Sequence, residues 1–234
     1  MNVAVIFAGG VGKRMNTSNT PKQFLKVNNK EILAYTIDKF QKSELIDGII
    51  LVVLKDYIDL TNEICKKYDF AKVRRIVGGG ETGQESIYNG LIASKELYDD
   101  KTLVLINDGV RPMITKNDIE LAIELTKNKG NAIPVTKAVD TIAINSKDGE
   151  LGEIVKRDAV LYAKAPQTFI LKEILEAHEK ARKDKLNFID SASMMQYYGY
   201  KLYTFNCGED NIKITTPIDY DIFKGLIEAG KNAD

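Results

Sequence analysis

Three cations close to the start of the chain follow a glycine-rich stretch, which itself follows an apolar run. Residues 3–7 are rich in Val and Ile, as is typical of a buried parallel strand, and Gly9, Gly10 and Gly12 come next. The three cations are Lys13, Arg14 and Lys22. Glycine lets backbone N–H groups approach an anion, while Lys and Arg neutralise its charge. The stretch therefore predicts a site for a phosphate-rich ligand, with a merely basic surface loop as the alternative.

Two common phosphate-binding loops do not fit this stretch. A Walker A loop needs Ser or Thr directly after its Gly-Lys pair, whereas Arg14 follows Lys13, and its leading glycine position holds Phe7. A dinucleotide fingerprint needs a third glycine where Met15 stands. A different kind of nucleotide or phosphate site is expected.

Further chemistry-bearing segments follow other expected strands. In open α/β sheets, ligands bind at the carboxyl ends of the strands. Four segments come at such ends: residues 8–22, 78–86, 107–112 and 211–215. Asp108 ends a buried strand, where a lone carboxylate needs a cation, so a cation is expected beside it; the alternative is an Asp that caps the next turn.

The elements that must position these segments alternate between strand and helix patterns. Strands are expected at 48–54, 73–77, 102–106 and 201–205. Helices are expected at 30–42, 60–68, 84–97, 171–183, 191–198 and 216–229, the last with Thr216 as its cap and Pro217 in its first position. This alternation predicts an α/β fold, with a mostly parallel sheet and right-handed crossovers.

The alternation of strand and helix patterns is interrupted between residues 134 and 163. An extended segment over 134–145, a turn over 146–149 and a returning strand over 151–155 predict a β-arm, which we assign to residues 137–163. Because an unpaired apolar edge invites aggregation, such an arm is more often an interface. A homodimer formed through the arm is therefore our hypothesis.

Length and composition exclude several classes of protein. The 234 residues suffice for one α/β domain, which we assign to residues 1–234, and the net charge of zero indicates no nucleic-acid surface. No apolar run approaches the roughly 20 residues of a membrane span, and the chain starts directly on a strand, so we expect a cytoplasmic protein. Cys65 and Cys207 are far apart and are expected to be reduced thiols.

The single histidine narrows the chemistry further. His178 lies in a charged helical stretch and is expected to be a solvated surface residue. A hydrolase with a Ser-His-Asp triad and a histidine-rich zinc site are therefore excluded.

Six groups of residues, taken together, resemble one known family. They are AGGVGKRM with PKQFL, GGGETGQES, NDGVRP, VDTI, VKRD with APQTF, and DNIKITTP, in the family's order and spacing over nearly the whole chain. The chain resembles the sugar- and polyol-phosphate nucleotidyltransferases, in the branch of cytidylyltransferases that act on 2-C-methyl-D-erythritol 4-phosphate and ribitol 5-phosphate. The resemblance implies a Rossmann-like fold of the nucleotide-diphospho-sugar transferase type. It also implies transfer of a cytidylyl group from CTP to a polyol phosphate, a divalent magnesium ion, and dimerisation through the arm.

The resemblance also implies roles for individual residues. Arg14 and Lys22 match the pair that stabilises charge on the α-phosphate, Arg157 and Lys213 match the pair that holds the acceptor's phosphate, and Asp108 matches the magnesium ligand. The positions on the nucleotide side are Phe7, Ala8, Gly9, Gly10, Gly79, Gly80, Glu81 and Ser86, and those that touch the polyol are Arg111, Thr141 and Asp190. Since a phosphate monoester is already an anionic nucleophile, the reaction needs charge neutralisation and positioning rather than a general base.

Departures from the family pattern bear on the acceptor. Val110 and the uncharged Ala143 resemble the ribitol branch, whereas other departures fit neither branch. These are Gly83, Asn107, Lys164, Ala165 and Ile189. We expect a pentitol phosphate, ribitol 5-phosphate first, as the acceptor for a surface polymer, with methylerythritol phosphate for isoprenoid synthesis as the alternative. A non-catalytic nucleotide-binding protein is the alternative of another class. A glycosyltransferase would show an Asp-x-Asp motif, which residues 107–109 lack.

Overall fold

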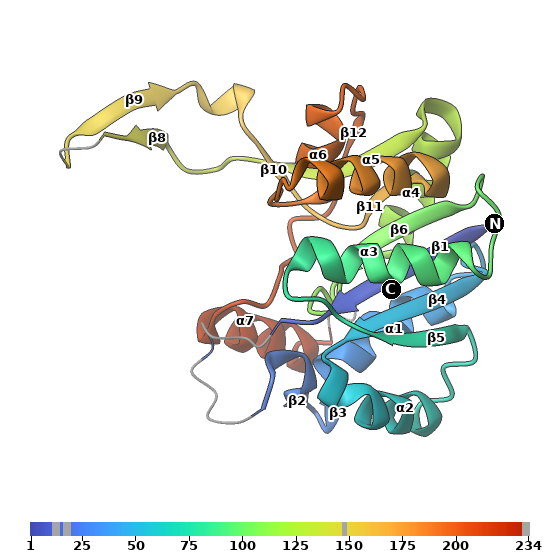
Figure 1. Cartoon of the computed structure of the whole chain (residues 1–234). Helices are drawn as coiled ribbons and strands as arrows, with labels where there is room; N and C mark the ends of the chain where they lie inside the picture. The colour runs from blue at the N-terminus through green and yellow to red at the C-terminus, as the bar shows by residue number, and fades with distance from the viewer. Residues whose placement is uncertain (11–14, 16–19, 147–148, 231–234) are drawn as a thin grey trace.

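A mostly parallel sheet runs through the protein (Figure 1). The computed structural model describes residues 1–10, 15, 20–146 and 149–230, and within these ranges the sheet has eight strands. The strands are β1 (Asn2–Ala8), β4 (Gly48–Val53), β5 (Val73–Gly78), β6 (Leu103–Asp108), β7 (Asn131–Lys137), β10 (Leu161–Ala163), β11 (Gln167–Ile170) and β12 (Thr204–Asn206). Their order is β10-β7-β11-β6-β1-β4-β5, with β12 paired to β7. The pairs of β1 with β4 and β6 are parallel, as predicted, and β11 is antiparallel to both its neighbours.

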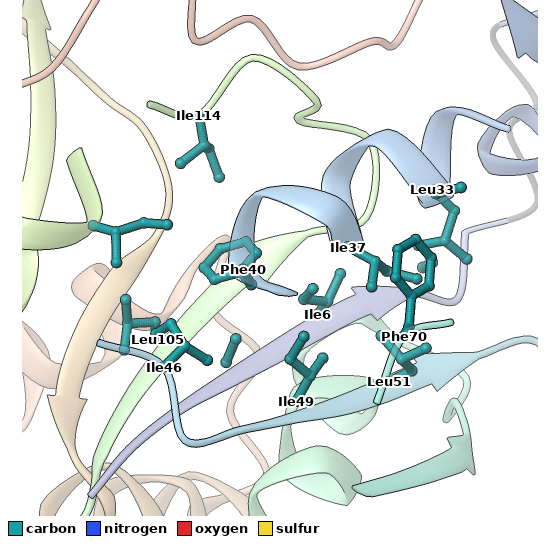
Figure 2. Close-up of a cluster of buried hydrophobic side chains, with 14 of the residues drawn as sticks. Ile6, Leu33, Ile37, Phe40, Ile46, Ile49, Leu51, Phe70, Leu105 and Ile114 are labelled. Atoms are coloured by element: carbon teal, nitrogen blue, oxygen red, sulfur yellow. The ribbon is translucent and has the colours of Figure 1, made fainter. Parts of the chain in front are cut away.

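Helices cover both faces of this sheet. The helices are α1 (Ile32–Lys42), α2 (Ile58–Lys67), α3 (Gly83–Lys95), α4 (Lys116–Lys129), α5 (Leu171–Asp184), α6 (Ser191–Tyr197) and α7 (Pro217–Glu228). Successive side chains of β1 point to opposite faces: Ala4 and Ile6 pack in the core with α1, α2 and α4, while Val3 and Val5 pack with α3, α5 and α6. Figure 2 shows the first of these cores, where Phe40 and Ile37 of α1 lie above Ile6. Burial on both faces explains the continuous apolar runs of β1, β4 and β6.

The structure adds elements that the sequence patterns did not predict. Helix α4 begins with a capping box formed by Thr115 and Asp118 and ends at Gly130, whose φ is 89°. Two short strands, β2 (Lys26–Val27) and β3 (Lys30–Glu31), form a separate hairpin. Helix α7 begins as predicted, with Thr216 as the cap and Pro217 in the first position.

The predicted arm is present and projects away from the sheet (Figure 1). It consists of β8 (Ile142–Asn145) paired antiparallel with β9 (Leu151–Val155), followed by a 3₁₀ turn over Arg157–Ala159. The expected extended segment starts earlier than the arm because residues 131–137 form β7 of the main sheet. Leu151 and Ile154 of the arm are 73% and 61% exposed.

Two further expectations can be compared with the described residues. Cys65 and Cys207 are free thiols, as predicted. None of the helices found in the described ranges has the length and apolar character that crossing a membrane requires.

Candidate active site

Two adjoining cavities open where the strands β1 and β6 end. The glycine cavity, about 480 Å³ in volume, is lined by Gly9, Gly10 and Gly80 among others. The helical cavity, about 570 Å³, is lined by side chains of α3, α5, α6 and the loop before α6. Five residues line both cavities and form a shared wall: Phe7, Thr82, Gly83, Asp108 and Lys213. A ligand in one cavity therefore lies next to a ligand in the other.

Close packing of two glycine loops shapes the glycine cavity. A Cβ atom at Gly9 or at Gly79 would lie 3.0 Å from Oγ of Ser86, so a larger residue would push the loops apart. The Ser86 hydroxyl accepts a hydrogen bond from the N–H of Gly80 (3.1 Å) and donates one to the carbonyl of Thr82 (2.9 Å). Ser86 thus fixes the loop after β5 with two hydrogen bonds and packs closely against Gly9 in the loop after β1.

Lys22 and Gln23 also line the glycine cavity and hydrogen-bond to the backbone around it. Nζ of Lys22 donates a hydrogen bond to the carbonyl of Ile214 at 2.8 Å, although 192 positions separate the two residues. The amide of Gln23 donates to the carbonyls of Ala8 (2.7 Å) and Gly10 (3.2 Å). The PKQFL segment therefore places one cation in the cavity and fixes the backbone of the glycine loop.

Asp108 forms the centre of a charge cluster on the shared wall. Its Oδ1 accepts from Nζ of Lys213 at 2.5 Å, and its Oδ2 accepts from Nε of Arg111 at 2.8 Å. Nη1 of Arg111 also donates to the carbonyl of Asn211 at 3.0 Å. Burial alone would raise the pKa of the Asp108 carboxyl, but Arg111 and Lys213 together hold that pKa below its usual range. Asp108 is therefore ionised at neutral pH.

Polar groups of the helical cavity come from the chain on either side of α5. Gln167 donates to Oδ2 of Asp190 at 2.8 Å, and Asp190 also caps α6 through the N–H of Ser193. Lys164 lines this cavity as well, and burial, with Arg111 nearby, lowers the pKa of its ammonium group. Three cations, Arg111, Lys164 and Lys213, therefore face one hollow.

The expectation for His178 was wrong. Its side chain lies in the wall of the helical cavity and is only 1% exposed, under the ring of Tyr88 at a centroid distance of 5.9 Å. In the described part of the chain, neither ring nitrogen has a hydrogen-bond partner. Burial, with the charge of Arg182 nearby, lowers the pKa of the imidazole to about 4. The charged residues around it in sequence belong to the solvent face of α5, whereas His178 follows the buried face.

A stability measurement in mild acid tests this burial. An unfolded chain protonates His178 near pH 6.5, whereas the folded protein does so only near pH 4, so stability falls as the pH drops through this window. Between pH 7 and pH 5 the wild type should lose about 2 kcal/mol that a His178→Leu variant keeps. Urea unfolding at the two pH values measures the difference. Glu179→Gln, on the exposed side of the same helix, should follow the wild type, and parallel curves for wild type and His178→Leu would contradict the burial.

Most of the predicted site residues meet at the two cavities. Those on the glycine cavity are Ala8, Gly9, Gly10, Lys22, Gly80, Glu81 and Ser86, and those on the helical cavity are Arg111 and Asp190, with Phe7, Asp108 and Lys213 on both. Gly79 lines neither cavity but packs against Gly9 and Ser86. Arg14, together with Lys13, lies outside the described residues.

Two predicted residues lie apart from this site in the single chain. Thr141 and Arg157 are exposed on the arm and line neither cavity, and Arg157 donates to the carbonyl of Val139 at 3.2 Å. The pairing of Arg157 with Lys213 that the resemblance implies is therefore not formed within one copy of the chain.

Several lining residues were not assigned from the sequence. Gln23 and Gln167 stand inside the motifs PKQFL and APQTF, so the motifs themselves were the available signal. Lys164 was noted only as a departure from the family pattern. For His178 the helical period of its apolar neighbours was the signal, since Ile174, Leu175 and Ala181 lie on the same buried face.

Comparisons with known proteins identify the family of this chain. The model of the IspD family, described as 2-C-methyl-D-erythritol 4-phosphate cytidylyltransferase, matches residues 2–228. A ribitol-5-phosphate cytidylyltransferase of Vibrio parahaemolyticus is 44% identical, over 99% of this chain and 98% of the relative. A 2-C-methyl-D-erythritol 4-phosphate cytidylyltransferase of Clostridium botulinum is 40% identical, over 97% of both chains.

A solved structure shares the architecture over nearly the whole length. The crystal structure of 4-diphosphocytidyl-2C-methyl-D-erythritol synthase from Anaerococcus prevotii has a TM-score of 0.83 and 29% sequence identity, covering 97% of this chain and 96% of that chain. The expected Rossmann-like fold is thereby confirmed. The chain belongs to the IspD family of cytidylyltransferases, which are enzymes that use CTP.

Proposed function

We propose that this enzyme transfers a cytidylyl group from CTP to a pentitol phosphate, with ribitol 5-phosphate as the acceptor. The single observation that carries the proposal is the pair of cavities with Asp108 and Lys213 on their shared wall. CTP occupies the glycine cavity and the acceptor occupies the helical cavity. An acceptor phosphate oxygen attacks the α-phosphorus of CTP, the bond from that phosphorus to the bridging oxygen breaks, and pyrophosphate leaves with the electron pair.

Charge and positioning supply the catalysis in this proposal. The acceptor phosphate is already an anion, so no proton has to be removed before it attacks. Lys22 faces the glycine cavity and stabilises charge on the α-phosphate, while Arg111 and Lys213 hold the acceptor next to it. Arg14 is proposed as the second cation at the α-phosphate.

The choice of acceptor rests on relatives and on the cavity. The relatives named ribitol-5-phosphate cytidylyltransferase are 42–44% identical over nearly the whole chain. The relatives named for methylerythritol phosphate reach 40%, so that acceptor stays the second candidate. The helical cavity offers Gln167 and Asp190 as hydrogen-bonding groups for hydroxyls, besides its three cations. Because the donor is CTP, which is made in the cytoplasm, we place the enzyme there, at the start of surface polymer synthesis.

We also propose a magnesium ion at Asp108. In the described residues no cluster of three His, Cys, Asp or Glu side chains could hold a metal by itself. Magnesium usually keeps several waters and takes one or two carboxylates plus substrate phosphates, so one buried carboxylate beside the phosphate-binding cavity is a suitable donor. Each Asp108 oxygen accepts one cation hydrogen bond and keeps a further lone pair. The ion would neutralise phosphate charge.

The arm leads us to propose a homodimer whose active sites are completed in trans. Apolar residues of β9, among them Leu151 and Ile154, are exposed to solvent in the single chain. Arg157 and Thr141 lie on the same arm, away from the cavities of their own chain. An arm that packs against a second copy carries both residues toward the partner's helical cavity.

A pyrophosphate-release assay with CTP and magnesium tests the reaction. Ribitol 5-phosphate, 2-C-methyl-D-erythritol 4-phosphate and inorganic phosphate are supplied in turn. The highest kcat/KM is expected with ribitol 5-phosphate. Release with methylerythritol phosphate alone would favour the isoprenoid function, and no release with any acceptor would favour a non-catalytic nucleotide-binding protein.

Complementation tests the shared site. Arg157→Ala and Lys213→Ala should each be nearly inactive alone, because each leaves every site incomplete. Co-expressed, they should regain about a quarter of wild-type activity, since half of random dimers are mixed and each mixed dimer has one complete site. Light scattering should give twice the chain mass of 26.1 kDa. Activity that stays absent in a mixed population of proven dimers would show that Arg157 does not act in trans.

A further inference from the structure

Two buried polar side chains in the wall of the helical cavity have no hydrogen-bond partner. His178 and Ser191 are 1% and 3% exposed, and both line the cavity. Within the described residues, both ring nitrogens of His178 and Oγ of Ser191 are unpaired. Buried polar groups are nearly always satisfied, and an unsatisfied one costs about 1–3 kcal/mol. Two such residues facing one hollow indicate that a molecule entering the cavity supplies their partners.

The local fold does not require the polar atoms of either His178 or Ser191. Asp190 and Ser193 form the capping box of α6, so the hydroxyl of Ser191 is not needed to start that helix. His178 lies on the buried, mostly apolar face of α5 and under Tyr88, where an aliphatic side chain of similar volume would bury as well. Their polar atoms are therefore best explained by what enters the cavity.

The chemistry of the two groups selects a hydroxyl-rich ligand. A neutral imidazole presents one donor and one acceptor, a serine hydroxyl presents both, and an alcohol hydroxyl complements either. With a pKa of about 4, His178 is uncharged at neutral pH, so it cannot neutralise a phosphate. Positive charge in this cavity comes instead from Arg111, Lys164 and Lys213, of which Lys213 stands on the wall shared with the glycine cavity.

We propose that His178 and Ser191 form a subsite that hydrogen-bonds hydroxyl groups of the acceptor's polyol chain. The subsite orients the acceptor with its phosphate toward Asp108 and Lys213, where it meets CTP. This inference rests on the proposed function and extends it to the recognition of the polyol. The polar atoms of His178 and Ser191 are almost inaccessible to solvent. Met194 lines the same cavity, and its flexible, unbranched side chain can move aside so that the ligand reaches them.

The single histidine makes the inference directly measurable. Untagged protein labelled with ¹⁵N-histidine gives imidazole signals from His178 alone. Ribitol 5-phosphate should shift both ring-nitrogen resonances in a saturable way, whereas inorganic phosphate and CTP should leave them in place. An unchanged imidazole in protein saturated with ribitol 5-phosphate would overturn the inference, as would an equal shift with inorganic phosphate.

Kinetics of variants give a second readout. Ser191→Ala and His178→Leu should each raise KM for ribitol 5-phosphate about 5- to 10-fold, the worth of one hydrogen bond. KM for CTP and kcat should stay within about twofold, because the reacting groups are untouched. Glu179→Gln, exposed on the same helix, is the matched control. A merely structural role would lower the unfolding temperature and leave the acceptor KM unchanged, which would contradict the inference.

The two proposals can fail separately. Wild-type protein that shifts its imidazole with ribitol 5-phosphate but releases no pyrophosphate would refute the proposed reaction and keep the subsite. Turnover of ribitol 5-phosphate without any shift of the His178 ring-nitrogen resonances would refute the subsite and keep the reaction. Neither turnover nor a shift would refute both.

Discussion

Replacing Lys22 by alanine should lower kcat about 100- to 1000-fold, the usual effect of removing one group that stabilises transition-state charge. Lys22 stands at the start of a 3₁₀ turn over Lys22–Phe24, where it lines the glycine cavity and its Nζ donates to the carbonyl of Ile214. Since a partly exposed lysine contributes little to packing, its loss should cost about 1 kcal/mol of stability, or about 2–4 °C in Tm for a chain of this size. Steady-state pyrophosphate release and thermal unfolding measure the two effects on the same preparation.

Lys26 provides the matched control for this prediction. It lies four residues further along, is exposed in an ion pair with Glu31, and lines neither cavity. Lys26→Ala should keep wild-type kcat, because Lys26 lines neither cavity and Glu31, although buried, keeps Lys67 as a partner. A Lys22→Ala enzyme that loses activity only in proportion to its folded fraction would make Lys22 a structural residue.

The parallel core of the fold could be predicted from the sequence because two signals agree there: the spacing of the apolar residues and the turn residues that bound each apolar run. Strands β4 and β6 are short apolar runs, β5 ends at Gly78 and β6 at Asp108, and helical patterns follow β4 and β5. Helix α4 was not predicted, because charged residues of its solvent face stand between its apolar positions. Its ends were nevertheless readable, as Thr115 and Asp118 form a capping box and Gly130 terminates the helix.

The candidate site was predictable where backbone and charge define it, and less so where packing does. The loops after β1, β5 and β6 meet because parallel strands end at one edge, so Gly9, Gly80 and Asp108 could be placed together in advance. The helical period could place His178 on the buried face of α5, but not at a cavity, because the cavity depends on how α5 and α6 pack. Arg157 shows another limit: local sequence says that it lies on an arm, but not which copy of the chain the arm serves.

Asp108→Asn should have the other large effect, because this carboxylate pairs with two cations and is also the proposed magnesium ligand. The amide keeps the shape of the side chain but removes the charge that Arg111 and Lys213 share, in a position that is 6% exposed. Breaking a buried pair in this way costs about 3 kcal/mol. Activity should fall at least about 100-fold, and the magnesium concentration for half-maximal rate should rise, since the proposed metal ligand is weakened.

Two measurements distinguish the pairing of Asp108 with its cations from its proposed role as a magnesium ligand. They are the stability at acidic pH and the substitution of a second buried aspartate. Because the pKa of Asp108 is lowered in the folded protein, its contribution to stability is complete above the unfolded value near 3.8 and is lost as the pH falls below it. The stability difference between wild type and Asp108→Asn should therefore shrink below pH 4. Asp118, 1% exposed in the cap of α4, is the control: Asp118→Asn should lose about 1 kcal/mol with full activity. An Asp108→Asn enzyme with an unchanged magnesium requirement would show that Asp108 organises the two cations and does not hold the metal.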